Sequence, residues 1–137
     1  MSLLEIDKKN LPRHVAVIMD GNGRWAKKKG QRREYGHRAG RKAVKRIVES
    51  CVELKIKNLT LYAFSTENWN RPKLEIDFLM QLLLLSLKDE LKNLNKNNIK
   101  FETIGNLERL PKKISNSLLK VKEETKDNSE LTLTLAL

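Results

Sequence analysis

A short, uninterrupted apolar run near the start of the chain ends in a polar turn that contains two glycines. The run is Val15–Met19, and Asp20-Gly21-Asn22-Gly23-Arg24-Trp25 follows it directly. An apolar run of this length is typical of a strand buried on both faces of a parallel sheet. Glycines let backbone N–H groups turn toward an anion, and a helix that follows adds its positive end. The junction therefore predicts a site for a phosphorylated ligand.

Asp20 is an acidic residue within this otherwise anion-binding turn. Arg24 offers a bidentate clamp for phosphate, but the Asp20 carboxylate repels phosphate unless a cation lies between them. The turn therefore indicates a divalent metal at Asp20, a role for Asp20 in proton transfer, or both. Asp20 alone is also compatible with a helix N-cap, although a simple cap requires neither two glycines nor an arginine.

Strand and helix patterns alternate along the whole chain. This alternation predicts a single α/β domain, residues 1–137, with a largely parallel central sheet flanked by helices. Ligands bind such sheets at the carboxyl ends of the strands, so we expect the turn 20–25 and the polar loop 65–71 to form one cleft. Helices are predicted at about 22–29, 37–54, 75–97 and 111–126, further strands at 59–64, 99–104 and 131–137, and a polar loop at 31–36.

The last predicted strand, 131–137, is apolar and has nothing after it to cover its sheet face or its edge. Exposed apolar edges are a liability that natural domains avoid. We therefore expect a domain that is incomplete at its C-terminus, from a C-terminally truncated chain.

Positive charge is concentrated near the N-terminus. The net charge is +11, and residues 24–46 hold eleven Lys or Arg residues and one acid, Glu34. Such a field attracts polyanions, of which nucleic acid, anionic lipid and diphosphate are the candidates.

The composition places the chain among globular proteins. A hydrophobic content of 39% with 33% charged residues indicates a soluble protein. The chain shows neither a secretory signal nor an apolar stretch of about twenty residues, so we expect a cytoplasmic protein. The single Cys51 excludes a disulfide framework and is interpreted as a small hydrophobic residue of a helix.

The predicted helix 75–97 carries apolar residues on two faces. One sheet buries only one stripe, so the second stripe must face another helix, another subunit or an apolar ligand. An apolar ligand beside an anion-binding turn would combine hydrocarbon with diphosphate, as an isoprenoid does. The first stripe is Ile76, Leu79, Met80, Leu83, Leu87, Leu91 and Leu94, and the opposite side holds Phe78, Leu82 and Leu85.

Three motifs carry a family resemblance. His14–Ala26 (HVAVIMDGNGRWA), Gly36–Gly40 (GHRAG) and Leu61–Pro72 (LYAFSTENWNRP) closely resemble the cis-prenyltransferases of the undecaprenyl diphosphate synthase type. Similarity in element order runs through all 137 residues and implies the N-terminal part of the cis-prenyltransferase fold. The resemblance implies an isoprenyl transferase that condenses isopentenyl diphosphate with an allylic diphosphate, farnesyl diphosphate. Such an enzyme forms Z double bonds, releases pyrophosphate and makes the lipid carrier for bacterial cell-wall sugars.

The resemblance also implies roles for residues within these motifs. Asp20 would bind Mg²⁺ and help to ionise the allylic diphosphate, and Asn68 matches the residue assigned as proton acceptor. Because a neutral amide is a poor base, we expect Asn68 to position substrate. The helix 75–97 would wall a hydrophobic tunnel for the growing chain. Substrate contacts would come from Gly21, Asn22, Gly23, Arg24, Trp25, Arg33, His37, Ser65, Thr66, Glu67, Trp69 and Arg71.

Family members continue with segments that supply the isopentenyl diphosphate site and dimer contacts. The resemblance therefore implies a homodimer for the full-length protein, with peripheral membrane contact left open and no nucleic-acid partner. An inactive fragment of such an enzyme is one alternative. A nucleic-acid-binding module, motivated by the basic residues 24–46, is another, but it gives the second apolar stripe of the helix 75–97 no purpose. A non-catalytic partner subunit and a shorter-chain synthase are further alternatives.

Overall fold

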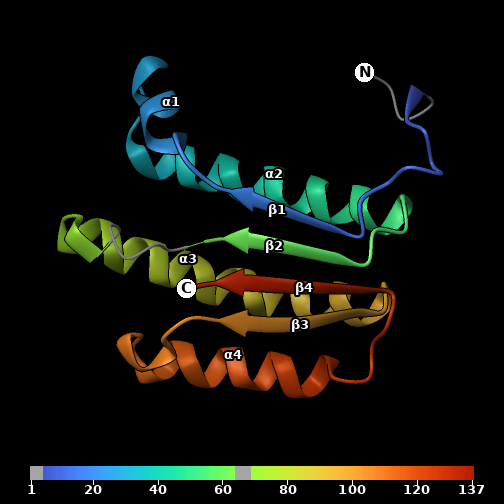
Figure 1. Ribbon diagram of the computed structural model, residues 1–137. Coiled ribbons are helices and arrows are strands. Elements are labelled where there is room, and N and C mark those ends of the chain that lie inside the picture. Colours follow the sequence, from blue (N-terminus) through green and yellow to red (C-terminus); the bar gives the residue numbers. More distant parts are fainter. Residues whose placement is uncertain (1–4, 64–68) are drawn as a thin grey trace.

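The computed structural model describes residues 5–63 and 69–137 as a parallel sheet with helices packed against it (Figure 1). The strand order is β1-β2-β4-β3, and every neighbouring pair is parallel. The predicted α/β fold with a parallel sheet is confirmed. The elements in chain order are β1 (His14–Ile18), α1 (Asn22–Lys28), α2 (Arg33–Glu53), β2 (Asn58–Tyr62), α3 (Lys73–Lys96), β3 (Ile99–Ile104), the short 3₁₀ helix η3 (Leu107–Arg109), α4 (Lys112–Thr125) and β4 (Leu131–Ala136).

The core lies between the strands and the helices α2, α3 and α4. Ile18 of β1 is 79% exposed. The prediction that this first strand is buried on both faces is therefore wrong: β1 is an edge strand, and helices cover one of its faces. The buried core side chains of the strands include Leu59, Leu61, Ile99, Phe101, Leu131, Leu133 and Leu135. Cys51 of α2 is also buried in this core, which confirms its interpretation as a small hydrophobic residue of a helix.

Helix α2 begins at Arg33, four residues before the predicted start, so residues 33–36 are helical and the predicted loop 31–36 is shorter. Gly36, the last residue of the predicted loop, is buried inside the helix. A Cβ at Gly36 would collide with the backbone oxygen of Asn22 in α1. The glycine thus marks the close approach of α1 to α2, and not a helix boundary. Helix α3 likewise begins two residues early, at Lys73, directly after Pro72.

Strand β4 lies inside the sheet, between β2 and β3. Both of its edges are therefore hydrogen-bonded, and the expectation that nothing caps its edge is wrong. The outer edge of β3 is covered instead by α4. There the buried Thr125 hydroxyl accepts a hydrogen bond from the Phe101 backbone N–H at 3.0 Å and donates to the Val121 carbonyl at 2.8 Å. Across residues 5–63 and 69–137, none of the helices combines the length and the apolar character needed to cross a bilayer.

Candidate functional site

The turn after β1 holds the Asp20 carboxylate at the carboxyl edge of the sheet. Gly21 has φ +85° and is the N-cap of α1, so the interpretation of Asp20 as a helix N-cap is wrong. The Asp20 Oδ1 atom accepts a hydrogen bond from the Gly21 backbone N–H at 2.7 Å. Arg24 Nη2 lies 3.3 Å from Asp20 Oδ2, and the two side chains are 71% and 68% exposed. Asp20 and Arg24 are thus both accessible to a ligand.

Close packing of α1 on α2 brings Arg33 over the first turn of α1. A Cβ at Gly23 would lie 2.8 Å from the guanidinium carbon of Arg33, so only glycine leaves room for this arginine without a shift. Gly40 makes similar room for the Asn22 side chain. The predicted site residues Asn22, Gly23 and Arg33 are therefore brought together by the two helices.

Three basic side chains from two parts of the chain meet at Glu75 in the first turn of α3. Arg33 Nε donates to Glu75 Oε1 at 3.2 Å, and His37 Nε2 lies 3.2 Å from the same oxygen. Arg71 Nη1 is 3.9 Å from it. The Glu75 side chain is 13% exposed. Because an ionised carboxylate only accepts hydrogen bonds, the Nε2 atom of His37 carries the hydrogen of this contact.

The basic neighbours of Glu75 determine its ionisation. Burial alone would raise its pKa, but hydrogen bonds from His37 and Arg33, with the charges of Arg33 and Arg71, hold the pKa of Glu75 below its ordinary value. Glu75 was not among the residues predicted from the sequence. Glu75 follows Arg71 by four residues, a spacing that favours an ion pair in a helix, and this spacing could have indicated the contact.

The second predicted loop is described only in part. Ser65, Thr66, Glu67 and Asn68 lie outside the described residues, and their predicted roles stay predictions. Trp69 packs partly buried against the core, with the Arg109 guanidinium carbon 5.0 Å from its ring centre. Arg71 contacts the same Glu75 oxygen of α3 that Arg33 and His37 of α2 contact.

Trp25 lies on the exposed side of α1. Its ring stacks on that of Tyr35 in α2, with ring centres 5.7 Å apart and planes inclined by 6°. An apolar cavity lies between α2, α3 and the sheet. Asn22 and His37 line this cavity, and Trp25 is not among its described lining residues. A contact between Trp25 and substrate stays a prediction.

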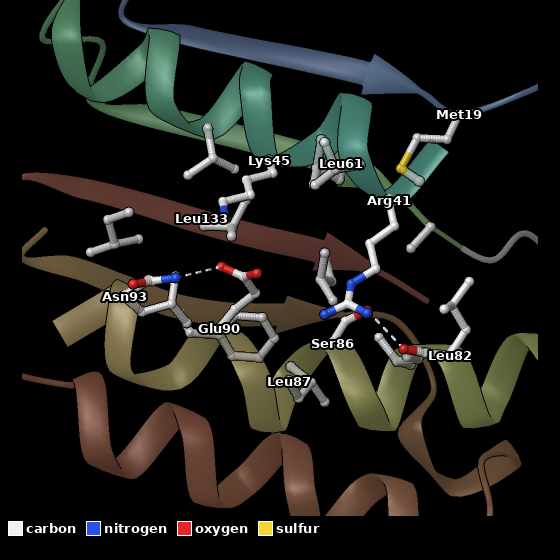
Figure 2. Close-up of a pocket in the computed structure, with 18 of the residues that line it drawn as sticks. Met19, Arg41, Lys45, Leu61, Leu82, Ser86, Leu87, Glu90, Asn93 and Leu133 are labelled. Atoms are coloured by element: carbon white, nitrogen blue, oxygen red, sulfur yellow. Dashed lines mark hydrogen bonds between the residues drawn. The ribbon is translucent and has the colours of Figure 1, made fainter. Parts of the chain in front are cut away.

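A largely apolar cavity of about 460 Å³ lies between α2, α3 and the sheet. Figure 2 shows Arg41 and Lys45 extending from α2 toward α3, where Ser86, Glu90 and Asn93 form a polar border. Arg41 also pairs with Asp89 of α3, at 2.8 Å. Met19, Asn22 and His37 line the cavity where it adjoins the turn after β1. Its apolar wall includes Val44, Val48, Leu61, Leu79, Leu82, Leu83, Leu87, Phe101, Leu133 and Leu135.

The two apolar faces of α3 have different neighbours. Met80 and Leu87 of the first stripe are buried in the core and also border the cavity. On the opposite side, Leu82 borders the cavity and the Phe78 ring lies 6.3 Å from His37 of α2, while Leu85 is exposed. The second stripe therefore faces a neighbouring helix through Phe78, one of the three possibilities that the sequence left open, and it borders the cavity through Leu82.

Residues 18–137 match the family described as "Putative undecaprenyl diphosphate synthase". An isoprenyl transferase of Fusobacterium nucleatum is 49% identical over 129 residues, which cover 94% of this chain and 56% of that protein. The crystal structure of lavandulyl diphosphate synthase from Lavandula x intermedia, in complex with dimethylallyl diphosphate, superposes with a TM-score of 0.87 at 35% identity, covering 92% of this chain and 54% of that one.

A probable undecaprenyl diphosphate synthase from Campylobacter jejuni superposes with a TM-score of 0.75 at 40% identity, covering 93% of this chain and 55% of that one. The chain spans about half the length of the curated relatives it matches. The match covers most of the chain and includes the turn after β1, the residues around Glu75 and the helices that wall the cavity. The chain therefore belongs to the undecaprenyl diphosphate synthase family of prenyltransferases.

Proposed function

We propose that this chain binds the allylic diphosphate substrate of a cis-prenyltransferase, and that the protein it belongs to condenses isopentenyl diphosphate with farnesyl diphosphate to make undecaprenyl diphosphate. One observation carries the proposal. The apolar cavity adjoins the turn after β1 through Asn22 and His37, so a site for phosphate and a site for hydrocarbon are continuous. A prenyl diphosphate has both parts and fits both sites at once.

Negative charge builds on the pyrophosphate as it leaves the allylic carbon. Arg24, the N–H groups of the turn, Arg33 and His37 would stabilise that charge, and Glu75 holds Arg33 and His37 in place before the reaction begins. Arg33 contacts Glu75 through Nε, and its guanidinium has further N–H donors for an anion. The proton lost after carbon–carbon bond formation requires only a weak base nearby or the departing pyrophosphate. A positioning role for Asn68 is part of this proposal.

Asp20 fits Mg²⁺ as one protein ligand. Within residues 5–63 and 69–137, no group of three or more His, Cys, Asp or Glu side chains is placed to hold a metal ion. Mg²⁺ in proteins is commonly held by one or two carboxylates together with substrate phosphates, and the exposed Asp20 carboxylate at the sheet edge suits that arrangement. The bound ion would neutralise charge on the diphosphate. The homodimer implied by the resemblance is likewise a proposal.

Calorimetric titration with farnesyl diphosphate, pyrophosphate and farnesol, each with Mg²⁺, tests the binding proposal. We expect farnesyl diphosphate to bind more tightly than either of its halves, because only it occupies both the turn and the cavity. Equal affinity for pyrophosphate and farnesyl diphosphate would overturn the assignment of the cavity.

The catalytic proposal is tested with Asp20→Ala in the protein expressed from its gene. We expect this variant to lose incorporation of labelled isopentenyl diphosphate while keeping its far-UV circular dichroism spectrum. Undiminished incorporation would refute the role of Asp20.

A further inference from the structure

The turn after β3 is held in place on both sides of Arg109. The Asn106 side chain caps η3 by accepting a hydrogen bond from the Glu108 backbone N–H at 3.1 Å. Leu110 follows Arg109 directly, is buried in the core and donates its backbone N–H to the Leu107 carbonyl at 3.1 Å. The backbone of Arg109 is therefore anchored, and its exposed side chain projects from a fixed turn.

The Arg109 side chain lies over the ring of Trp69, in the loop between β2 and α3. Its guanidinium carbon is 5.0 Å from the ring centre. The turn after β3 and the loop after β2 both lie at the carboxyl edge of the sheet, and β4 separates the two strands (Figure 1). Across residues 5–63 and 69–137, no acidic side chain forms an ion pair with Arg109. Because an aromatic ring face attracts positive charge, this contact holds the guanidinium and the ring together.

The position of Trp69 restricts the position of Arg71. Only Asn70 separates the two residues, and Arg71 precedes Pro72, which limits the backbone of Arg71 to extended conformations. The Trp69 side chain also packs partly buried against the core. A displacement of the Trp69 ring would therefore move Arg71, whose Nη1 atom lies 3.9 Å from Glu75 Oε1.

We propose that Arg109 is a positioning residue of the diphosphate site, which acts through the ring of Trp69 and keeps Arg71 beside Glu75. Two basic side chains of α2 contact the same carboxylate. A displaced Arg71 would therefore take one positive charge away from the place proposed for the diphosphate. This inference rests on the proposed function and extends the site to the turn after β3.

The strand order separates Arg109 from the turn that holds Asp20. Strands β2 and β4 lie between β1 and β3. Neighbouring strands are about 4.8 Å apart, so the ends of β1 and β3 are separated by about 14 Å. Arg109 therefore acts on the loop after β2 and not directly on a diphosphate bound at the turn after β1.

Calorimetric titration of the chain with pyrophosphate and Mg²⁺ tests the proposal. Arg109→Met removes the charge and keeps the length of the side chain, whereas Arg109→Lys keeps a cation. Lys112→Met, at the start of α4, is the matched control, because it removes one positive charge from an exposed side chain three residues further along. The Arg109→Met change is also made in a Trp69→Leu background.

We expect Arg109→Met to bind pyrophosphate about two- to fivefold more weakly, the factor that corresponds to an exposed contact between a cation and a ring. Arg109→Lys and Lys112→Met should each change the affinity less than about twofold, because the first keeps a cation over the ring and the second removes a screened surface charge. In the Trp69→Leu background, Arg109→Met should cause no further loss, since residues that act through one another are not additive.

Three results of this titration would overturn the proposal. One is normal binding by Arg109→Met. Another is a loss of the same size in Arg109→Lys or Lys112→Met, because charge alone or the shape of the guanidinium would then explain the effect. The third is a full loss in the Trp69→Leu background, because Arg109 would then act without the ring.

Fluorescence anisotropy decay of Trp69 tests the positioning step without any ligand. The chain has two tryptophans, so Trp25→Phe leaves Trp69 as the single reporter. On the nanosecond timescale, we expect the ring to depolarise faster in Arg109→Met than in Arg109→Lys or in the chain with Arg109 unchanged. Unchanged ring motion with normal pyrophosphate binding would overturn this inference and leave the proposed function standing. Failure of the unmodified chain to bind pyrophosphate would refute the proposed function, and this inference with it.

Discussion

His37 of α2 and Glu75 of α3 are joined by a 3.2 Å contact that spans 38 residues of sequence, and Arg33 donates to the same carboxylate oxygen. Two residues that the family resemblance assigned to diphosphate binding are thus held by an acidic side chain of the protein itself. Glu75 holds both side chains, of which His37 lines the cavity, and it links the two helices that wall the cavity.

Glu75→Gln should destabilise the chain. The amide keeps the size of the side chain but removes the charge that pairs with Arg33 and Arg71, and hydrogen bonds to a charged, poorly exposed group contribute most. We expect a loss of about 1–2 kcal/mol in the free energy of unfolding, measured by urea titration at neutral pH. Asp89→Asn is the control, since it removes the ion pair between Arg41 and the 61% exposed Asp89 and should cost less than about 0.5 kcal/mol. Equal losses would contradict a special role for Glu75.

The stabilising effect of Glu75 should depend on pH. Its pKa in the folded protein lies below the ordinary value, so folding favours the ionised carboxylate. The contribution is therefore complete above the pKa of an unfolded glutamate, about 4.3, and is lost as the pH falls through the lower folded-state pKa. The stability difference between the unmodified chain and Glu75→Gln should stay constant from neutral pH down to about 5 and shrink below about 4. If the stability difference between the two proteins stayed the same through the acid range, the charge of Glu75 would not be the cause of that difference.

The order of strands and helices could be predicted because it depends on local patterns. Apolar runs bounded by polar turns indicated the four strands, and the alternation with helices indicated the parallel sheet. The burial of β1 could not be predicted, because its apolar residues have the same pattern whether or not a helix covers the second face. The start of α2 was missed for a similar reason. Gly36 serves a contact with Asn22 in another helix, and a single sequence does not distinguish that use from a loop.

Residue patterns alone predicted the candidate site where its residues are contiguous, and the family resemblance added Arg33, His37 and Arg71 from other motifs. The turn from Asp20 to Arg24 forms one unit in sequence and in structure. Glu75 was missed because its role depends on contacts with Arg33 and His37 of α2, which are about forty residues away in the sequence. Nothing in the sequence around Arg109 indicated its contact with the ring of Trp69.

Leu83→Trp should separate binding of the prenyl tail from binding of the diphosphate. Leu83 lines the cavity, so a larger ring would take up space proposed for hydrocarbon. Excluding two or more CH₂ groups from an apolar site corresponds to at least about tenfold weaker binding of farnesyl diphosphate. Calorimetry should show pyrophosphate affinity unchanged. Leu85→Trp, on the exposed side of the same helix, is the matched control. If both variants bound farnesyl diphosphate normally, the tail would lie elsewhere.

Gly36→Ala should separate α1 from α2. The added methyl group would collide with the backbone oxygen of Asn22, which cannot rotate away as a flexible side chain could. Overpacking of this kind costs about 1–3 kcal/mol, so we expect a lower melting temperature by calorimetry. Because Arg33 and Asn22 depend on the same contact, we also expect weaker binding of pyrophosphate.

The control for this change is Gly30→Asn, in the turn between the two helices. Gly30 has φ +69°, and apart from its chain neighbours no described residue has an atom within 4 Å of the position a Cβ would take; asparagine tolerates this backbone conformation. Its cost should be below about 1 kcal/mol, with pyrophosphate affinity retained. Normal stability and affinity in Gly36→Ala would mean that α1 can shift without disturbing the site. The close glycine contact would then not be what holds Asn22 and Arg33 in place.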